Sequence, residues 1–294
     1  MIDAQLHCWE ADNPLRPWRA DYGTRDPVEA ANRAHQSEHP ITFGDLIARM
    51  DAAGVDAALL VTPAVYGADN SYTLEAAARH PDRFAVVGRV DPEAPDIEER
   101  LASWRKQPGM LGLRLLIGSE KERAAFRAGM LDRVFSACAR HAIPVCVFPP
   151  GILPELARVA SAHPGLQLVI DHLGLSQPPL MQAEADPFGR LPELLDLARL
   201  PNIAVKLTAV PALSSRKFPF EDIWPALHRV LNAFGPRRLV WGSDHTRTAS
   251  LHTYTEALTY LRDTNEVSSA DKLQLLGGSL RRLFGWVRTP VEDR

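Results

Sequence analysis

The sequence predicts an α/β protein, a (β/α)8 TIM barrel that forms a single domain over residues 1–294 with a long first βα loop. Eight short apolar segments alternate with helical segments along the chain. Strands that alternate with helices form a parallel sheet through right-handed crossovers, and eight such units close a barrel. An open doubly wound sheet is the alternative, but the chain lacks the G-x-G-x-x-G loop or P-loop that such sheets usually carry.

The first expected strand, Ile2 to His7, is unusual because half of its residues are polar. Side chains alternate between the two faces of a strand, so Asp3, Gln5 and His7 are expected on one face and the apolar residues on the other. Buried polar groups need partners, which makes this face a candidate functional surface. The next segment, residues 8–41, has neither helical nor strand periodicity, and loops of this length are usually functional.

Local patterns predict seven further strands and the helices between them. Thr42 can cap a helix that stops at Gly54, and buried parallel strands are short, nearly continuous apolar runs. The expected strands are 56–63, 84–90, 111–117, 144–148, 166–172, 203–208 and 238–244. The expected helices are 42–53, 70–79, 97–106, 131–141, 154–163, 191–200, 220–234, 252–263 and 270–284.

The composition is that of an ordinary globular protein, with 46% apolar and 23% charged residues. The net charge is −3 and the basic residues are scattered, so nothing favours a nucleic-acid partner. No apolar run approaches the length of a membrane span, and no signal peptide is recognisable. Cys8, Cys138 and Cys146 form no C-x-x-C pair, which fits a cytoplasmic protein. A monomer and a homodimer are both left open.

Polar residues at the C-terminal ends of the strands are the candidate site residues, because the active site of a TIM barrel lies there. This filter selects Gln5, His7, Arg114, His172, Lys206, Thr208 and Asp244. Asp244 has the parity of Val240 and Gly242 and is expected to point inward, where a carboxylate needs a metal, a cation or several donors to stay charged. Each candidate also has a purely structural alternative. Asp244 could cap a turn through backbone amides, and His172 could be a core residue whose hydrogen bonds are satisfied.

Two basic residues fall inside apolar strands. A buried guanidinium or ammonium must be paired or must bind an anion. Arg114 therefore either binds a substrate anion or forms an ion pair, and Lys206 has the same two solutions. The carboxylates considered for the ion pair of Arg114 are Asp3, Asp91 and Asp244.

Three loop residues are candidates for substrate binding because their loops would overhang the pocket. They are Trp18, Arg216 and Arg247. For Trp18 the alternative is packing of the first loop onto the barrel. For the two arginines the alternative is a solvated surface position.

Five short motifs occur in order at the expected strand ends. They are Asp3-Ala4-Gln5-Leu6-His7-Cys8-Trp9, Gly112-Leu113-Arg114-Leu115, Asp171-His172-Leu173-Gly174, Val205-Lys206-Leu207-Thr208 and Trp241-Gly242-Ser243-Asp244. With these motifs the chain resembles the amidohydrolase-2 family of the amidohydrolase superfamily. Within it the chain resembles the branch of 2-pyrone-4,6-dicarboxylate hydrolase, sugar lactonases and galactarolactone isomerase. The resemblance covers nearly the whole chain.

The resemblance implies a hydrolase that opens a lactone ring. Asp244 would be the general base that activates water, and His172 would polarise or orient the scissile carbonyl. His7 is a further catalytic candidate, which either contacts the substrate or supports Asp244, and Gln5 is a candidate for substrate binding. The cations implied for a substrate carboxylate are Arg114 and one or more of Arg216, Lys206 and Arg247.

Two departures from the family pattern concern a metal. Metal-dependent members carry His-x-His on strand 1 and another histidine at the end of strand 5, where this chain has Gln5 and Phe148-Pro149. An amide is a poor replacement for imidazole on zinc, so a metal-independent lactonase without a cofactor is expected. The alternative is one Zn²⁺ held by His7, His172 and Asp244.

Three other functions are left open. They are a zinc-dependent amidohydrolase or decarboxylase of the same fold, a lactone isomerase, and a non-catalytic barrel that binds organic acids. In all of them the expected partner is a small anionic lactone or organic acid. The choice among them depends on loops that the sequence does not place.

Overall fold

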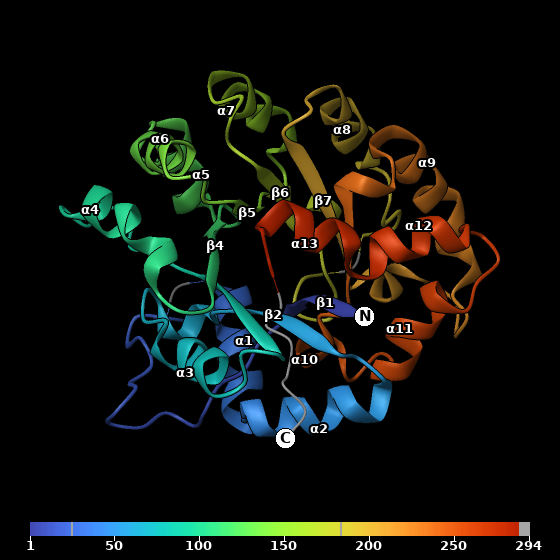
Figure 1. The fold of residues 1–294 in the computed structure, drawn as a ribbon, viewed down its shortest axis with the longest axis horizontal. Helices are drawn as coiled ribbons and strands as arrows, with labels where there is room; N and C mark the ends of the chain where they lie inside the picture. The colour runs from blue at the N-terminus through green and yellow to red at the C-terminus, as the bar shows by residue number, and fades with distance from the viewer. Residues whose placement is uncertain (25, 183, 288–294) are drawn as a thin grey trace.

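The computed structural model describes residues 1–24, 26–182 and 184–287. Eight parallel strands form one sheet in the order β1 to β8, and helices surround it (Figure 1). The strands are β1 (Ile2–Leu6), β2 (Ala57–Val61), β3 (Phe84–Gly88), β4 (Met110–Leu116), β5 (Val145–Phe148), β6 (Leu168–Ile170), β7 (Ile203–Thr208) and β8 (Leu239–Gly242). Each predicted strand is present, and the predicted (β/α)8 barrel is confirmed.

The α-helices lie in the connections between the strands and after the last one. They are α1 (Pro27–Glu38), α2 (Phe43–Ala53), α3 (Ser71–Arg79), α4 (Ile97–Ala102), α5 (Glu120–Arg127), α6 (Asp132–Arg140), α7 (Leu156–Ala162), α8 (Leu191–Asp196), α9 (Trp224–Phe234), α10 (His245–Thr248), α11 (Tyr254–Arg262), α12 (Ser269–Leu273) and α13 (Ser279–Phe284). No helix of the described residues is long and apolar enough to cross a membrane.

The seam between β8 and β1 is held by Asp3. Its carboxylate accepts hydrogen bonds from the backbone N–H groups of Gln5 and Ser243, at 2.9 and 3.0 Å, and from the hydroxyls of Ser243 and Tyr254. The backbone N–H of Asp244 also donates to the Gln5 carbonyl at 3.0 Å. Burial, the largest influence, raises the pKa of Asp3 to about 6, although these hydrogen bonds lower it. A residue of the first strand therefore fixes the position of the last strand's end.

The prediction that Asp3 shares a face with Gln5 and His7 is wrong. The register of β1 against β2 shifts between Asp3 and Leu6, and such an irregularity changes which side chains face inward. Ile2 and Ala4 pack in the interior of the barrel, whereas Leu6 belongs to the core outside the sheet. After the shift it is Gln5 and His7 that point inward.

The prediction that residues 8–41 lack regular structure is also wrong, because α1 occupies part of this segment. Asp26 caps the helix by accepting from the backbone N–H groups of Val28 and Glu29, and Pro27 stands at its first position. Gln36 is its only buried described residue, so the apolar stripe that reveals most helices is missing. Helix α5 was missed as well, although Ser119 and Glu122 form a capping box.

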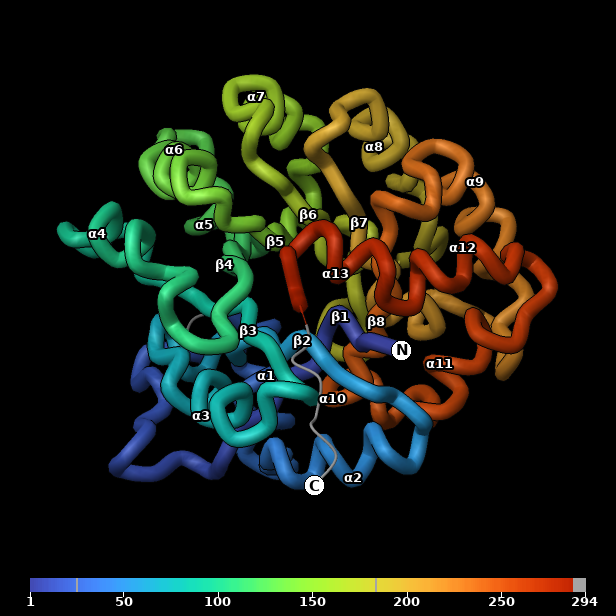
Figure 2. Tube along the Cα trace, viewed as in Figure 1, coloured from blue at the N-terminus to red at the C-terminus, as the bar shows by residue number. Residues whose placement is uncertain are grey.

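The expected helix 270–284 is interrupted. A π-helical turn at Gln274–Gly278 separates α12 from α13. Gly277 in this turn has φ 150°, and a Cβ atom added there would lie only 3.2 Å from the side chain of Ile2. Both helices lie across one end of the barrel, where the tube passes in front of the strands (Figure 2). Leu280 and Phe284 are buried in the same cluster as Ile2. Helices α12 and α13 therefore close the end of the barrel that lies opposite the C-terminal ends of the strands.

Replacing Asp3 with alanine tests the seam. The substitution leaves four buried donors without their acceptor, and each unsatisfied donor costs about 1–3 kcal/mol. We expect Asp3→Ala to lower the free energy of unfolding in urea by about 3 kcal/mol or more. Asp196→Ala, at an exposed position of α8, is the control and should change it by less than about 0.5 kcal/mol. An equal, small effect of both substitutions would contradict the role of Asp3.

Candidate active site

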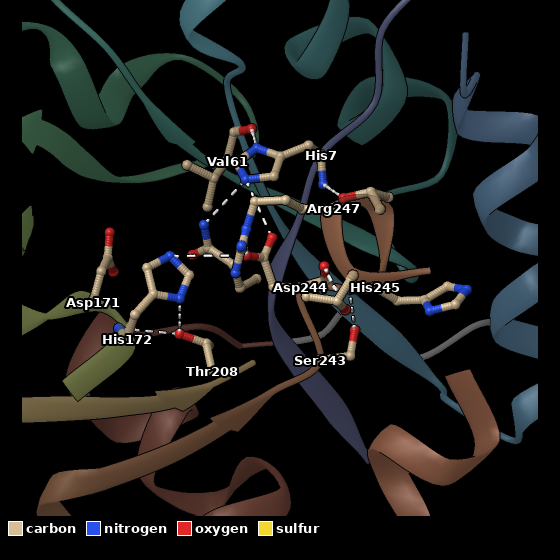
Figure 3. A network of polar contacts seen from close by, with 12 residues as sticks. His7, Val61, Asp171, His172, Thr208, Ser243, Asp244, His245 and Arg247 are labelled. Carbon is tan, nitrogen blue, oxygen red and sulfur yellow. Dashed lines mark hydrogen bonds and ion pairs between the residues drawn. The ribbon is translucent and has the colours of Figure 1, made fainter. Parts of the chain in front are cut away.

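A cavity of about 190 Å³ lies at the C-terminal ends of the strands. Of the predicted site residues, five line it: His7, Arg114, His172, Asp244 and Arg247. They come from the ends of β1, β4, β6 and β8, and Figure 3 shows the imidazoles of His7 and His172 turned toward Asp244 and Arg247. The barrel thus brings together residues that are up to 240 positions apart in sequence.

Asp244 is the buried carboxylate of this cavity. It adopts φ 51°, a left-handed conformation that is rare outside glycine and that aspartate tolerates better than most residues. Its Oδ2 accepts from Nε of Arg247 at 2.6 Å, whereas its Oδ1 has no hydrogen-bond partner among the described residues. Burial by itself would raise the pKa of Asp244, but Arg247 and the two histidines together hold it below its usual value. The carboxylate is therefore ionised at neutral pH, with one oxygen free to accept a proton.

His7 is held in one tautomer. Its Nδ1–H donates to the carbonyl of Val61 at 2.7 Å, because a carbonyl can only accept. Its Nε2 accepts from the amide of Gln5 at 3.2 Å and lies 3.5 Å from Oδ1 of Asp244. Burial lowers the pKa of His7 to about 4. At neutral pH His7 therefore presents only an acceptor to the cavity.

His172 is fixed in the same way. Its Nδ1 is 2.7 Å from the hydroxyl of Thr208, and its Nε2 accepts from Nη2 of Arg114 at 3.4 Å. The residue has φ 55°, a strained backbone conformation of the kind found at functional sites. Burial lowers the pKa of His172 to about 3. Like His7 it is a neutral acceptor.

The sequence-based ion-pair partners of Arg114 were wrong, because the partner is Asp171. Asp171 Oδ2 accepts from Nε of Arg114 at 2.8 Å, and its Oδ1 lies 3.0 Å from Nζ of Lys206. Lys206 in turn donates to Oε1 of Gln5 at 2.7 Å. Burial would raise the pKa of Asp171, but Lys206 and then Arg114 outweigh it and hold the pKa far below its usual range. Asp171 precedes His172 in sequence and follows the end of β6. This position could have identified Asp171 as a partner of Arg114.

Four predicted substrate-binding residues do not line the cavity. Gln5 and Lys206 are completely buried beneath it. Trp18 is buried in the first loop, with the guanidinium of Arg33 5.6 Å from its ring. Arg216 is exposed and pairs with Glu221 at 2.9 Å. Their placement leaves Arg247, among the predicted substrate-binding residues, as the one that faces the cavity.

Other residues line the cavity without having been predicted. They are polar groups of the first loop, α1 and α5, and residues of the β6–α8 connection: Asp26, Glu29, Asn32, Gln36, Glu122, Gln177, Leu180 and Met181. None stands at a strand end, so the filter that found the catalytic candidates excluded them. The backbone carbonyls of Gln177 and Pro178 accept from Nη1 of Arg247 at 3.2 and 2.7 Å, which ties this connection to the site.

The donor set does not fit a catalytic metal. Nε2 of His7 and of His172 both already accept hydrogen bonds, and Oδ2 of Asp244 faces the guanidinium of Arg247. The described residues contain no group of three His, Cys, Asp or Glu side chains arranged to hold a metal ion. At the end of β5 the ring of Phe148 stands perpendicular to His172 at 5.3 Å, where the family pattern has a histidine.

An ionised, buried aspartate beside two neutral histidines at the C-terminal ends of barrel strands defines a barrel enzyme. The family model of the amidohydrolases, Amidohydro_2, matches residues 2–286. The chain belongs to this family, as its motifs predict.

Among curated proteins, the chain is 30% identical to the 4-sulfomuconolactone hydrolase of Hydrogenophaga intermedia over 75% of this chain and 70% of that protein. It is 27% identical to the L-fucono-1,5-lactonase of Burkholderia multivorans over 96% of this chain and 95% of that protein. Among solved structures, a zinc-bound amidohydrolase from Burkholderia multivorans is 26% identical, with a TM-score of 0.77 over 97% of this chain and 98% of that one.

The pH profile of the enzyme tests the pairing of Asp244 with Arg247. A base is active when deprotonated, so activity is lost as the pH falls through its pKa, and here that pKa is below the ordinary 3.8. In the Arg247→Met variant, burial still raises the pKa of Asp244, but the positive charge of Arg247 no longer lowers it. We expect the acidic limb of kcat/KM to move upward by roughly 1–3 pH units. Arg216→Met should leave the limb in place, and an unmoved limb in Arg247→Met would show that Arg247 does not control the carboxylate.

Proposed function

We propose that this protein is a hydrolase that opens the ring of a lactone with water activated by Asp244. One observation carries the proposal. Asp244 lines the cavity, is ionised and is fixed through Oδ2, and its buried Oδ1 has no donor among the described residues. The two curated relatives are named for lactone hydrolysis, which supports a lactone ester as the bond that is attacked.

The chemistry needs one water and one base. A water that donates to Oδ1 of Asp244 transfers that proton as its oxygen bonds to the lactone carbonyl carbon. The tetrahedral oxyanion then collapses, the bond from the carbonyl carbon to the ring oxygen breaks, and the ring oxygen takes the proton back from Asp244. The product is the open hydroxy acid, and the carboxylate is regenerated.

Arg114 and Arg247 are the groups that stabilise the oxyanion in this proposal. Both guanidinium groups line the cavity, and fixed cations in a buried site are effective because they need no reorganisation as charge develops. Asp171 and His172 hold Arg114 through Nε and Nη2. His172 therefore acts as a positioning residue for Arg114, because its Nε2 accepts rather than donates.

Metal independence belongs to the same proposal. A lactone carbonyl is more electrophilic than an amide, and two arginines supply the positive charge that a metal would otherwise bring. The free, buried state of Cys8, Cys138 and Cys146 supports a reducing compartment, so we also propose a cytoplasmic location. For the oligomeric state, monomer and homodimer remain the two expectations.

Asp244→Asn tests the proposal directly. Asparagine keeps the size of the side chain but cannot take the proton, so we expect kcat to fall by roughly 10²- to 10⁴-fold. The assay is acid release from a panel of pyrone dicarboxylates, muconolactones and aldonolactones, with NMR of the product. Asp263→Asn, at an exposed position paired with Arg262, is the matched control and should retain full activity.

Three results would reject parts of this assignment. Full activity of a folded Asp244→Asn protein would remove Asp244 as the base. A product that is a rearranged lactone without released acid would indicate an isomerase. Tight binding across the panel without turnover would indicate a binding protein.

A further inference from the structure

Gln177 is the one buried residue of the stretch 176–182, which follows the end of β6 and is otherwise partly or fully exposed. Gln177 is 2% exposed and lines the cavity of the active site. Its neighbours Ser176 and Pro178 line a second cavity, of about 230 Å³. Because open space lies against each of these residues, the position of the stretch depends on hydrogen bonds more than on packing.

The hydrogen bonds of Gln177 reach both residues that stand on either side of the Asp244 carboxylate, His172 and Arg247. Its Nε2 donates to the backbone carbonyl of His172 at 3.4 Å, and its Oε1 accepts from Nη2 of Arg247 at 3.3 Å. Its own backbone carbonyl accepts from Nη1 of Arg247 at 3.2 Å. One glutamine thus bridges the turn that carries His172 and the guanidinium that pairs with Asp244.

The guanidinium of Arg247 has almost no donor to spare. Nε donates to Asp244, Nη1 donates to the carbonyls of Gln177 and Pro178, and Nη2 donates to Oε1 of Gln177. An arginine has five N–H groups, so these four contacts leave one N–H of Nη2 without a partner among the described residues. Since Arg247 lines the cavity, this N–H is the one that it can offer to the oxyanion.

The acceptors that Gln177 and Pro178 present to Arg247 are neutral. Carbonyl and amide oxygens orient the guanidinium, but they do not neutralise its charge as a carboxylate would. In the described part of the chain, the carboxylate paired with Arg247 is that of Asp244. The stretch after β6 therefore fixes the direction of Arg247 and leaves its charge to Asp244.

We propose that Gln177 is a positioning residue, which holds Arg247 against Asp244 and directs the remaining N–H of Arg247 into the cavity. This inference rests on the proposed lactone hydrolysis and adds a residue to it. The contact also acts in the other direction, because Arg247 holds the stretch whose residues Leu180 and Met181 line the cavity. The wall of the cavity and the partner of the base are therefore coupled through Gln177.

Gln177→Met tests the proposal in a turnover assay. Methionine keeps the length of the side chain but can neither accept from Arg247 nor donate to His172. We expect kcat to fall by roughly tenfold, as loss of a hydrogen bond to a charged group gives, and KM to change by less than about threefold, because the contact acts on the developing oxyanion. The substrate is the lactone with the highest kcat/KM in the panel of pyrone dicarboxylates, muconolactones and aldonolactones.

Gln182→Met is the matched control for this assay. It makes the same change at an exposed residue of the same stretch that does not line the cavity. Both kcat and KM should stay at the values of the unchanged protein.

A double variant separates positioning from a general loss of packing. If Gln177 acts through Arg247, it has nothing left to position in the Arg247→Met protein. We therefore expect Gln177→Met to lower kcat by less than about twofold in that background, whereas independent effects would multiply.

Amide hydrogen exchange tests the same contact without any substrate. The N–H of Met181 donates to the Gln177 carbonyl at 3.1 Å and reports on the order of the stretch. We expect the peptide that covers residues 176–182 to exchange roughly tenfold faster in Gln177→Met and in Arg247→Met, because each variant removes hydrogen bonds between Arg247 and the stretch. Gln182→Met should exchange at the rate of the unchanged protein.

The outcomes distinguish this inference from the proposed function. Equal exchange in all four proteins overturns the inference, and so does a loss of kcat from Gln177→Met that the Arg247→Met background repeats in full. Faster exchange in both variants, with a loss of kcat that disappears in the double variant, supports it. Absence of turnover of every lactone by the unchanged protein rejects the proposed function, and the exchange rates then decide whether Gln177 holds Arg247.

Discussion

The buried carboxylate of Asp171 is the interaction on which the site depends. It is completely buried and balances both Arg114 and Lys206. From each cation a hydrogen bond continues to an imidazole: Arg114 donates to His172, and Lys206 donates to Gln5, which donates to His7. Removing one member of such a network leaves an unpaired buried charge, which is far more costly than the pair itself. Asp171 is therefore connected through these hydrogen bonds to both histidines around Asp244.

This network explains why glutamine suits position 5. The Lys206 ammonium can only donate, so it requires the carbonyl oxygen of the Gln5 amide. The amide nitrogen is then directed at Nε2 of His7, which must accept because its Nδ1–H is bound to the Val61 carbonyl. A neutral imidazole at position 5 could serve as acceptor and donor as well, but through a ring of different geometry. The glutamine is thus a connector between a buried cation and a histidine.

Much of the fold and part of the site follow from the sequence. Short apolar runs separated by helices are sufficient for the barrel, and the strand-end rule finds His7, Arg114, His172 and Asp244 because their positions depend on topology alone. The register shift in β1 and the partner of Arg114 depend on packing in three dimensions. The alternation of side chains along a strand cannot predict either of them. Helix α1 was missed because it has no buried apolar stripe, and Gln36 is its only buried described residue.

The central claim is that an aspartate paired with arginine activates water in this barrel where other members use a metal. The most direct test is zinc analysis of the same preparation in which turnover is measured, before and after dialysis against a chelator. The account predicts that kcat per chain is unchanged when zinc is far below one equivalent. A kcat that falls in proportion to the zinc removed and returns when zinc is added back would contradict it.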